Sequence, residues 1–188
     1  MRPRSTAKHR AILDAAVRLA GRRSYLDITM EAIAAEAGVG KQTLYRWWPS
    51  KAALYAEVYG GLVPRDMVSP DLGGIRDDLS AMLRTLFDIF RTCPAGPILM
   101  GLIAEAQIDA AARDIVMNGL FSGRRDLLIA PLERARRRGE LSPSTDISAL
   151  ADGIVAMVWH RLLTRTEPPG DEEVPAIVGL LLDSQVNE

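Results

Sequence analysis

The amino-acid sequence predicts an all-α protein, and three observations support this prediction. Every long segment repeats its apolar residues at steps of three and four, the spacing that lines up side chains on one face of a helix. Alanine, leucine and arginine dominate, whereas runs of β-branched residues are scarce. Glycine and proline recur at intervals that divide the 188 residues into helix-length segments. We therefore expect about nine helices.

The first 62 residues are expected to form four helices, separated by residues that typically begin or end a helix. Gly21, Gly38 and Pro49 lie at the ends of the first three, where glycine and proline are common. Thr29 and Ser50 precede the second and the fourth helix, where a hydroxyl accepts a hydrogen bond from a free N–H of the first turn. The expected bounds are 6–22, 30–37, 41–48 and 51–62.

Residues 63–74 are rich in proline, glycine and acids, which is typical of a linker. We therefore expect a first domain over residues 1–62 and a second over residues 63–188. The third helix of the second domain contains Gly119, Gly123 and Pro131 and is expected to be kinked or split. The five helices expected there span 75–91, 97–107, 110–138, 146–166 and 171–186.

The net charge of −1 conceals an asymmetry between the two parts of the chain. Residues 1–51 contain ten Lys and Arg but only four acids, a net charge of +6, and the remainder carries −7. A basic N-terminal quarter suits contact with a polyanion such as DNA. It equally suits a solvated helix surface, so charge alone leaves both interpretations open.

Composition and motifs disfavour several other classes of protein. No apolar run reaches the ~18 residues of a membrane span, and the N-terminus leads into a polar helix, so we expect a cytoplasmic protein. Cys93 is the single cysteine, which favours a small packed side chain over a disulfide or a nucleophile. His9 and His160 have no metal-binding spacing, and no catalytic set or phosphate-binding glycine loop stands out, so we expect neither an enzyme nor a cofactor. A helical protein-interaction module remains an alternative, and a salt-independent interaction would favour it.

Residues 29–48 have the spacing of a helix-turn-helix. Small and apolar residues, Ile33, Ala34 and Ala37, face inward from the first helix and let the second approach closely. Gly38 stands where the chain must turn with a positive φ. Leu44 packs the second helix back, which leaves polar side chains on its outer face: Lys41, Gln42, Thr43, Tyr45 and Arg46.

These motifs resemble the DNA-binding domain of the TetR family of bacterial repressors over residues 9–58. The resemblance rests on the segments ILDAA at 12–16, ITMEAIA at 28–34, AGVGKQTLY at 37–45 and PSKAAL at 49–54. The sequence departs from the family at Trp47–Trp48, where His or Arg followed by Phe or Trp is more usual. Trp48 fits the family's buried aromatic, and Trp47 falls where a polar contact to the DNA backbone is usual. A looser similarity to a TetR C-terminal domain lies in AEAQ at 104–107 and LERARRRGEL at 132–141.

The resemblance and the side-chain chemistry together imply DNA contacts. Gln42 and Thr43 are expected to read bases, Lys41 to reach guanine or phosphate, and Tyr45 to donate to a phosphate. Thr29, at a helix N-terminus, can face a phosphate, and Lys51 is a phosphate contact by family analogy. Trp47 either donates its indole N–H to a phosphate or packs. The basic arm of Arg2, Arg4 and Lys8 either follows the DNA or is a frayed tail. The expected DNA-binding set is Thr29, Lys41, Gln42, Thr43, Tyr45, Arg46, Trp47 and Lys51.

The second domain is expected to dimerise the protein and to bind a small apolar ligand that releases it from a palindromic operator. Family likeness places the dimer interface on the last two helices, at Ile154, Val158, Arg161, Leu162, Ile177, Leu180 and Leu181, although some of these must serve the protomer's own core. The side chains expected to line a ligand cavity are Phe87, Phe90, Met100, Ile103, Met117, Phe121 and Trp159, although such a stripe is more often core. The expected mode of action is repression, by a population shift between two spacings of the N-terminal domains.

Overall fold

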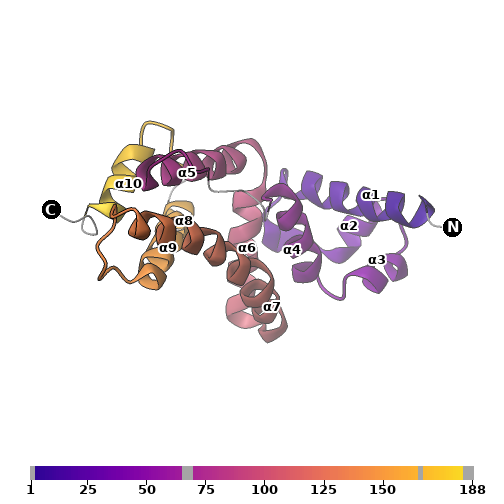
Figure 1. Ribbon diagram of the computed structural model, residues 1–188. Coiled ribbons are helices and arrows are strands. Elements are labelled where there is room, and N and C mark those ends of the chain that lie inside the picture. Colours follow the sequence, from indigo (N-terminus) through magenta and orange to yellow (C-terminus); the bar gives the residue numbers. More distant parts are fainter. Residues whose placement is uncertain (1–2, 65–69, 165–166, 184–188) are drawn as a thin grey trace. The chain divides into compact units, whose positions relative to one another are not determined.

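A computed structural model describes residues 3–64, 70–164 and 167–183, with the side chains of 3–5 and 119–126 left aside (Figure 1). The described residues form ten α-helices, one 3₁₀ turn and one π-helical segment, without a strand. The predicted all-α fold is therefore confirmed, with one more helix than expected.

The chain divides into two compact units, each made of two separate stretches. Met1–Val63 and Cys93–Leu120 form what we call the N-terminal unit, and Pro64–Thr92 and Phe121–Glu188 form the C-terminal unit. Residues 93–120 pack with the first stretch, so compactness divides the chain differently from the domain boundary expected within 63–74. That boundary stays a prediction.

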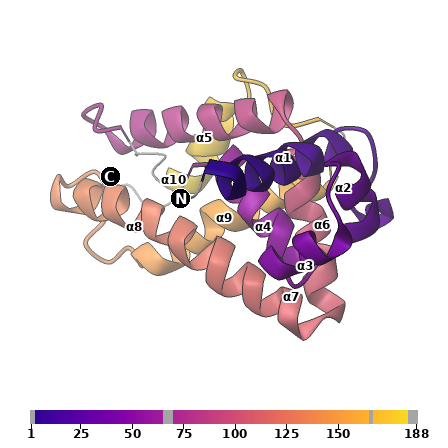
Figure 2. The ribbon, with the colours of Figure 1, turned by 90° about the vertical axis from the view of Figure 1, so that its right-hand side faces the viewer.

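In the N-terminal unit, α4 lies between α1 and α6, and the short helices α2 and α3 pack in succession beside α1 (Figure 2). Ile12, Ile33, Leu44 and Leu54 are fully buried in its core, and burial of each such side chain is worth about 1.5–3 kcal/mol. The helices of this unit are α1 (Pro3–Ala20), the 3₁₀ turn Tyr25–Asp27, α2 (Met30–Glu36), α3 (Lys41–Trp47), α4 (Lys51–Leu62), α6 (Ala95–Ile108) and α7 (Ala110–Ile115).

Both helix caps expected from the sequence are present. The Thr29 hydroxyl accepts a hydrogen bond from Ala32 N over 3.1 Å, and the Ser50 hydroxyl accepts one from Ala53 N over 3.1 Å. A cap of this kind contributes about 0.5–2 kcal/mol, because it satisfies an N–H with no partner inside the helix. The starts of α2 and α4 are therefore fixed by local chemistry.

The C-terminal unit packs α8 between α5 and α9, with α10 against α5 and α9. The helix expected over 110–138 is split, because a π-helical segment, Val116–Phe121, separates α7 from α8. Pro131 lies inside α8 without ending it. The bounds in this unit are α5 (Ile75–Thr92), α8 (Ser122–Arg137), α9 (Ile147–Thr164) and α10 (Val174–Leu182).

A buried carboxylate attaches the start of α5 to the end of α8. Asp78 is fully buried, and its Oδ1 accepts a hydrogen bond from Leu72 N over 2.7 Å. Its Oδ2 lies 3.5 Å from Arg134 Nη2 and 3.8 Å from Arg138 Nη2. The charge of Asp78 is thus compensated, as a buried charge requires.

Candidate nucleic-acid interface

The turn between α2 and α3 has the geometry that the sequence predicts. Gly38 adopts φ +65°, a left-handed conformation in which a Cβ would be strained. Val39 N donates to Ala34 O over 3.0 Å, which closes the corner. Leu44 is fully buried and holds α3 against the core. The outer face of α3 is therefore fixed in direction by packing on its inner side.

The side chains on that outer face are polar and exposed. Lys41, Gln42 and Arg46 are exposed, and Tyr45 is 46% exposed, whereas Thr43 is partly covered. Thr29, at the start of α2, is exposed as well. Seven of the eight expected DNA-binding residues thus lie on α3 or at the start of α2, and six of them carry hydroxyl, amide, ammonium or guanidinium groups suited to base edges and phosphates.

Lys41 has an intramolecular partner on this surface. Its Nζ lies 3.2 Å from Glu31 Oε1 in the first turn of α2, and both side chains are about half exposed. The pKa of Glu31 lies below its ordinary value, first because of a hydrogen bond with its own backbone and then because of Lys41. Ion pairs between exposed groups hold weakly, so a phosphate can replace Glu31 as the partner of Lys41.

Trp47 and Trp48, the two tryptophans at the end of α3, differ in environment. Trp48 is buried, and its Nε1–H donates to Glu57 Oε2 over 2.8 Å. Trp47 is partly exposed, stands edge-on to Trp48 at 5.7 Å, and carries the Arg46 guanidinium 6.0 Å from its ring centroid. Trp48 therefore fits the expected buried aromatic, and the Trp47 ring is packed on two sides.

Lys51 is not brought onto the exposed face of α3. Its side chain is only 18% exposed, and its Nζ donates to Tyr25 O over 3.1 Å. The same ammonium lies 3.8 Å from Glu105 Oε2 on α6 and 4.3 Å from the Tyr25 ring centroid. The phosphate contact expected for Lys51 therefore meets a competing set of partners, which sequence reasoning missed because Glu105 is remote in the chain.

Tyr25 joins this cluster through its hydroxyl, which donates to Glu105 Oε2 over 2.7 Å. Burial, followed by the Glu105 carboxylate, raises the pKa of Tyr25 far above its ordinary value, so the phenol stays protonated and remains a donor. The 3₁₀ turn, α4 and α6 thus meet at three polar side chains. Of the basic arm, Lys8 is exposed, whereas Arg2 and the side chain of Arg4 lie outside the described residues.

The seven side chains expected to line a ligand cavity are distributed over both units. Phe87 and Phe90 are buried in the C-terminal unit, where Trp159 is partly exposed. In the N-terminal unit, Met100 and Ile103 are partly exposed and Met117 is 53% exposed. Phe121 lies among the side chains that are not described. The ligand set therefore stays a prediction.

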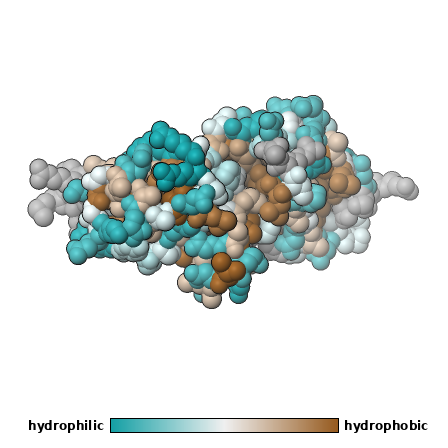
Figure 3. Space-filling view, turned by 180° about the vertical axis from the view of Figure 1, so that it is seen from behind, coloured by the Kyte–Doolittle hydropathy of each residue, from teal (hydrophilic) through white to brown (hydrophobic). Residues whose placement is uncertain are grey.

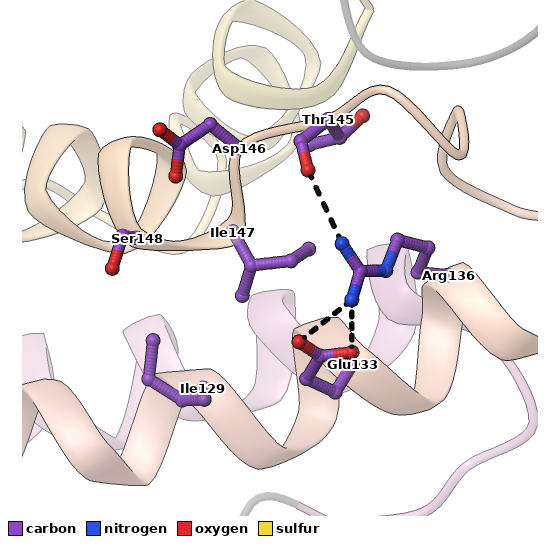
Figure 4. A pocket seen from close by; sticks show the side chains of 7 residues that line it. All are labelled: Ile129, Glu133, Arg136, Thr145, Asp146, Ile147 and Ser148. Carbon is purple, nitrogen blue, oxygen red and sulfur yellow. Dashed lines mark hydrogen bonds and ion pairs between the residues drawn. The ribbon is translucent and has the colours of Figure 1, made fainter.

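A cavity of about 270 Å³ lies in the C-terminal unit, between α8 and the start of α9 (Figure 4). Arg136 donates to both carboxylate oxygens of Glu133, over 2.9 and 2.7 Å, and to Thr145 O over 3.5 Å. Arg136 and Glu133 thus satisfy each other, whereas the Thr145 hydroxyl is buried without a hydrogen-bond partner among the described residues. Of the six expected ligand residues whose side chains are described, none is among the residues that line it: Ile129, Glu133, Arg136, Thr145, Asp146, Ile147 and Ser148.

The residues expected at a dimer interface divide into two groups. Ile154, Val158 and Ile177 are buried among the helices of their own unit, which agrees with the core role expected for some of this set; their place in a dimer interface stays a prediction. They point inward because α9 and α10 also supply the core of this unit. Leu180 is 75% exposed and Leu162 and Leu181 are partly exposed, while Arg161 Nη1 lies 3.5 Å from Glu173 Oε2.

Two family descriptions match most of the chain. Residues 12–58 match bacterial regulatory proteins of the tetR family, and residues 69–181 match the tetracyclin repressor-like C-terminal domain. The first match covers the helix-turn-helix described above, and the second covers α5 to α10 almost completely.

Individual proteins show the same likeness. The chain is 30% identical to the uncharacterized HTH-type transcriptional regulator YdeS of Bacillus subtilis (strain 168), over 94% of this chain and 89% of that protein. It is 30% identical to the DNA-binding transcriptional repressor TetR of Mycobacteroides abscessus, over 96% and 92% of the two chains. The crystal structure of the TetR family transcription regulator SCO0332 is 36% identical, with a TM-score of 0.75 over 96% of this chain and 99% of that one.

Proposed function

The chain belongs to the TetR family of bacterial regulatory proteins, and from this premise we propose that it is a repressor that binds a palindromic operator as a homodimer and is released by a small apolar ligand. The family match establishes a transcriptional regulator with a DNA-binding helix-turn-helix. Repression is supported by the M. abscessus relative, which is described as a DNA-binding transcriptional repressor. A repressor of bacterial genes acts on the chromosome, which places it in the cytoplasm.

The exposed polar face of α3 is the observation that supports DNA binding most directly. The helix is short, buries Leu44 and presents Gln42, Tyr45 and Arg46 outward, as a helix that enters a major groove must. In our proposal Gln42 and Thr43 read base edges, and Lys41, Tyr45, Arg46 and Thr29 contact bases or the backbone. Lys51 reaches a phosphate only if its ammonium leaves Tyr25 and Glu105.

Exposed residues of α9 and α10 support the homodimer. Ala149, Gly153, Ala156, His160 and Leu163 are exposed and repeat at alternating steps of four and three, the seam along which two helices pack. On α10, Ala176 and Leu180 continue this exposure one turn apart. By length and composition alone, α9 is apolar enough to cross a membrane. Only 22% of it is buried inside the protomer, so most of this apolar helix is exposed. A second copy that covers the exposed residues of α9 and α10, which together we call the α9–α10 face, would bury that apolar surface. Figure 3 shows one face of the molecule, on which hydrophobic side chains lie among hydrophilic ones.

The proposed ligand is a small apolar compound. The residues expected at its site carry aromatic, aliphatic or thioether side chains, which favour an apolar compound. Such a ligand would act by preferring a conformation in which the two recognition helices no longer match one turn of DNA, about 34–36 Å apart. The release of DNA by such a ligand is tested by adding small apolar compounds to the preformed complex of protein and operator. These compounds are chosen from the chemistry encoded by neighbouring genes.

Selection of genomic fragments bound by the purified protein tests DNA recognition. The recovered fragments should share a two-fold symmetric sequence, and affinity for it should fall steeply as salt rises, because Lys and Arg displace counterions from phosphates. A protein-interaction module would instead recover no common sequence and show no such salt dependence.

A pair of matched variants assigns the contact to α3. Arg46→Ala removes an exposed cation from α3, and Arg84→Ala removes one from α5 in the C-terminal unit, so both change the net charge equally. We expect Arg46→Ala to weaken operator binding by about tenfold, as loss of a good DNA contact does, and Arg84→Ala to leave it unchanged. Equal effects of the two variants would mean that α3 is not the helix that contacts the operator.

A further inference from the structure

A cluster of four side chains from three helices surrounds the end of the recognition helix. His9 comes from α1, Trp47 and Trp48 end the α3 segment, and Glu57 comes from α4. Glu57 uses both carboxylate oxygens: Oε2 accepts from Trp48 Nε1 over 2.8 Å, and Oε1 lies 3.0 Å from His9 Nε2. The His9 ring centroid lies 4.8 Å from that of Trp48 and 5.3 Å from that of Trp47.

Burial alone does not explain this pair of polar residues. The His9 and Glu57 side chains remain 36% and 45% exposed, so they add little to the apolar core. Trp48, by contrast, is buried and has an indole N–H that needs an acceptor. His9 and Glu57 therefore fix the direction of the two indole rings more than they fill space.

The position of the cluster links it to DNA reading. α3 has only seven residues, and its start is set by the Gly38 turn. Its other end leads into Trp48 and Pro49, so the orientation of Trp48 determines how the last turn, which carries Arg46, lies. A displacement of that turn by a fraction of an ångström would disturb contacts that depend on hydrogen-bond geometry.

We propose that His9 and Glu57 are positioning residues for DNA recognition, which hold the Trp47–Trp48 end of the recognition helix without touching DNA. This inference rests on the proposed function of α3. The pair bridges α1 and α4 across the end of α3, so the three helices keep one relative orientation.

The His9 ring contacts groups from both neighbouring helices. Glu57 of α4 lies beside its Nε2, and the two indole rings at the end of α3 lie against the imidazole ring. His9 Nε2 thus holds the carboxylate whose other oxygen accepts from Trp48 Nε1.

The decisive test compares Glu57→Ala with Asp14→Ala on the operator recovered by selection. Both variants remove one carboxylate from the N-terminal unit, and Asp14 is a half-exposed acid whose partner, Arg10, lies on its own helix. Simple electrostatics predicts that loss of either acid strengthens DNA binding. Our inference predicts that Glu57→Ala weakens operator binding by about tenfold, because the Trp48 N–H loses its acceptor, while Asp14→Ala does not weaken it.

Conservative variants separate positioning from general damage. Glu57→Gln keeps an oxygen for the Trp48 N–H and should bind the operator nearly as wild type. His9→Gln keeps a donor for Glu57 and should also bind nearly as wild type, whereas His9→Ala should weaken operator binding. A protein in which the pair merely adds stability would show no such difference at a temperature where all variants are folded.

The outcomes decide between the alternatives. Tighter or unchanged binding by Glu57→Ala, or an equal loss on operator and random duplex, overturns the inference. If Glu57→Ala does not fold, the comparison of His9→Ala with His9→Gln decides, and equal operator affinities of these two variants overturn the inference. A wild-type protein that binds no duplex at all would instead refute the proposed function.

Discussion

Two tyrosines of the N-terminal unit show how single buried side chains make this protein sensitive to alkali. Burial raises the pKa of Tyr55 above its ordinary value, and the Tyr55 hydroxyl donates to Ala16 O over 3.1 Å. Tyr25 has its pKa raised by burial and then by Glu105. In the unfolded chain both phenols titrate near pH 10. The folded state therefore holds these protons more tightly than the unfolded state does.

The free energy of unfolding should accordingly fall at high pH. The contribution of a group with a raised folded pKa is complete below the unfolded value, about pH 10, and is lost as the pH rises above it. Each tyrosine should lower the free energy of unfolding by about 1.4 kcal/mol per pH unit above pH 10. Denaturant unfolding between about pH 8 and pH 11.5 measures this slope. Tyr55→Phe should reduce it by one such contribution, whereas Tyr45→Phe, at an exposed tyrosine, should leave it unchanged.

At the scale of helices, local chemistry explains what could be predicted from the sequence. The bounds of α2, α3 and α4 agree with the expected ones to within about a residue, because Thr29, Gly38 and Ser50 act on their immediate neighbours. The break at Val116–Phe121 was expected only as a kink or a split, since a π-helical segment has no composition of its own.

The polar clusters could not be predicted because their members lie far apart in the sequence. Tyr25 and Glu105 are 80 residues apart, and nothing in either local sequence marks the other as a partner. Lys51 illustrates the consequence: the family pattern assigns it to phosphate, whereas the fold places Glu105 beside it. Likewise, the sequence left the role of Trp47 open, and its packing follows from His9 on another helix.

The contact between α6 and the 3₁₀ turn requires a glycine on α6. A Cβ at Gly101 would lie 2.1 Å from Tyr25 Cγ, which is too close for the ring to stay in place. We expect Gly101→Ala to lower the free energy of unfolding by about 1–3 kcal/mol, as overpacking of a core does, measured by denaturant unfolding. Gly60→Ala on α4 is the matched control, since no atom of the residues that the structure describes lies within 4 Å of the added Cβ. That control should stabilise the helix by up to about 1 kcal/mol, and a similar gain at Gly101 would contradict the close packing.

At the scale of the whole molecule, a short recognition helix needs a second copy to become selective. A helix of seven residues covers only a few base pairs, and two-fold pairing doubles the contacts. The α9–α10 face carries small residues that allow close approach, together with Leu163 and Leu180, which are 64% and 75% exposed. A surface of this composition is unfavourable in water and favourable against its own copy.

Leu180→Glu tests whether this face forms the dimer. A carboxylate at that position would lose its hydration when the α9–α10 face pairs with a second copy, which disfavours pairing. We expect light scattering to find monomers at concentrations where the wild type is dimeric, and operator affinity to fall by at least about tenfold, because two half-sites are no longer bound together. Ile108→Glu places the same charge at a residue that is 89% exposed at the end of α6 and should leave the dimer intact. If Leu180→Glu stays dimeric while Ile108→Glu dissociates, the pairing surface lies at the end of α6 instead, and the seam on α9 must have another occupant.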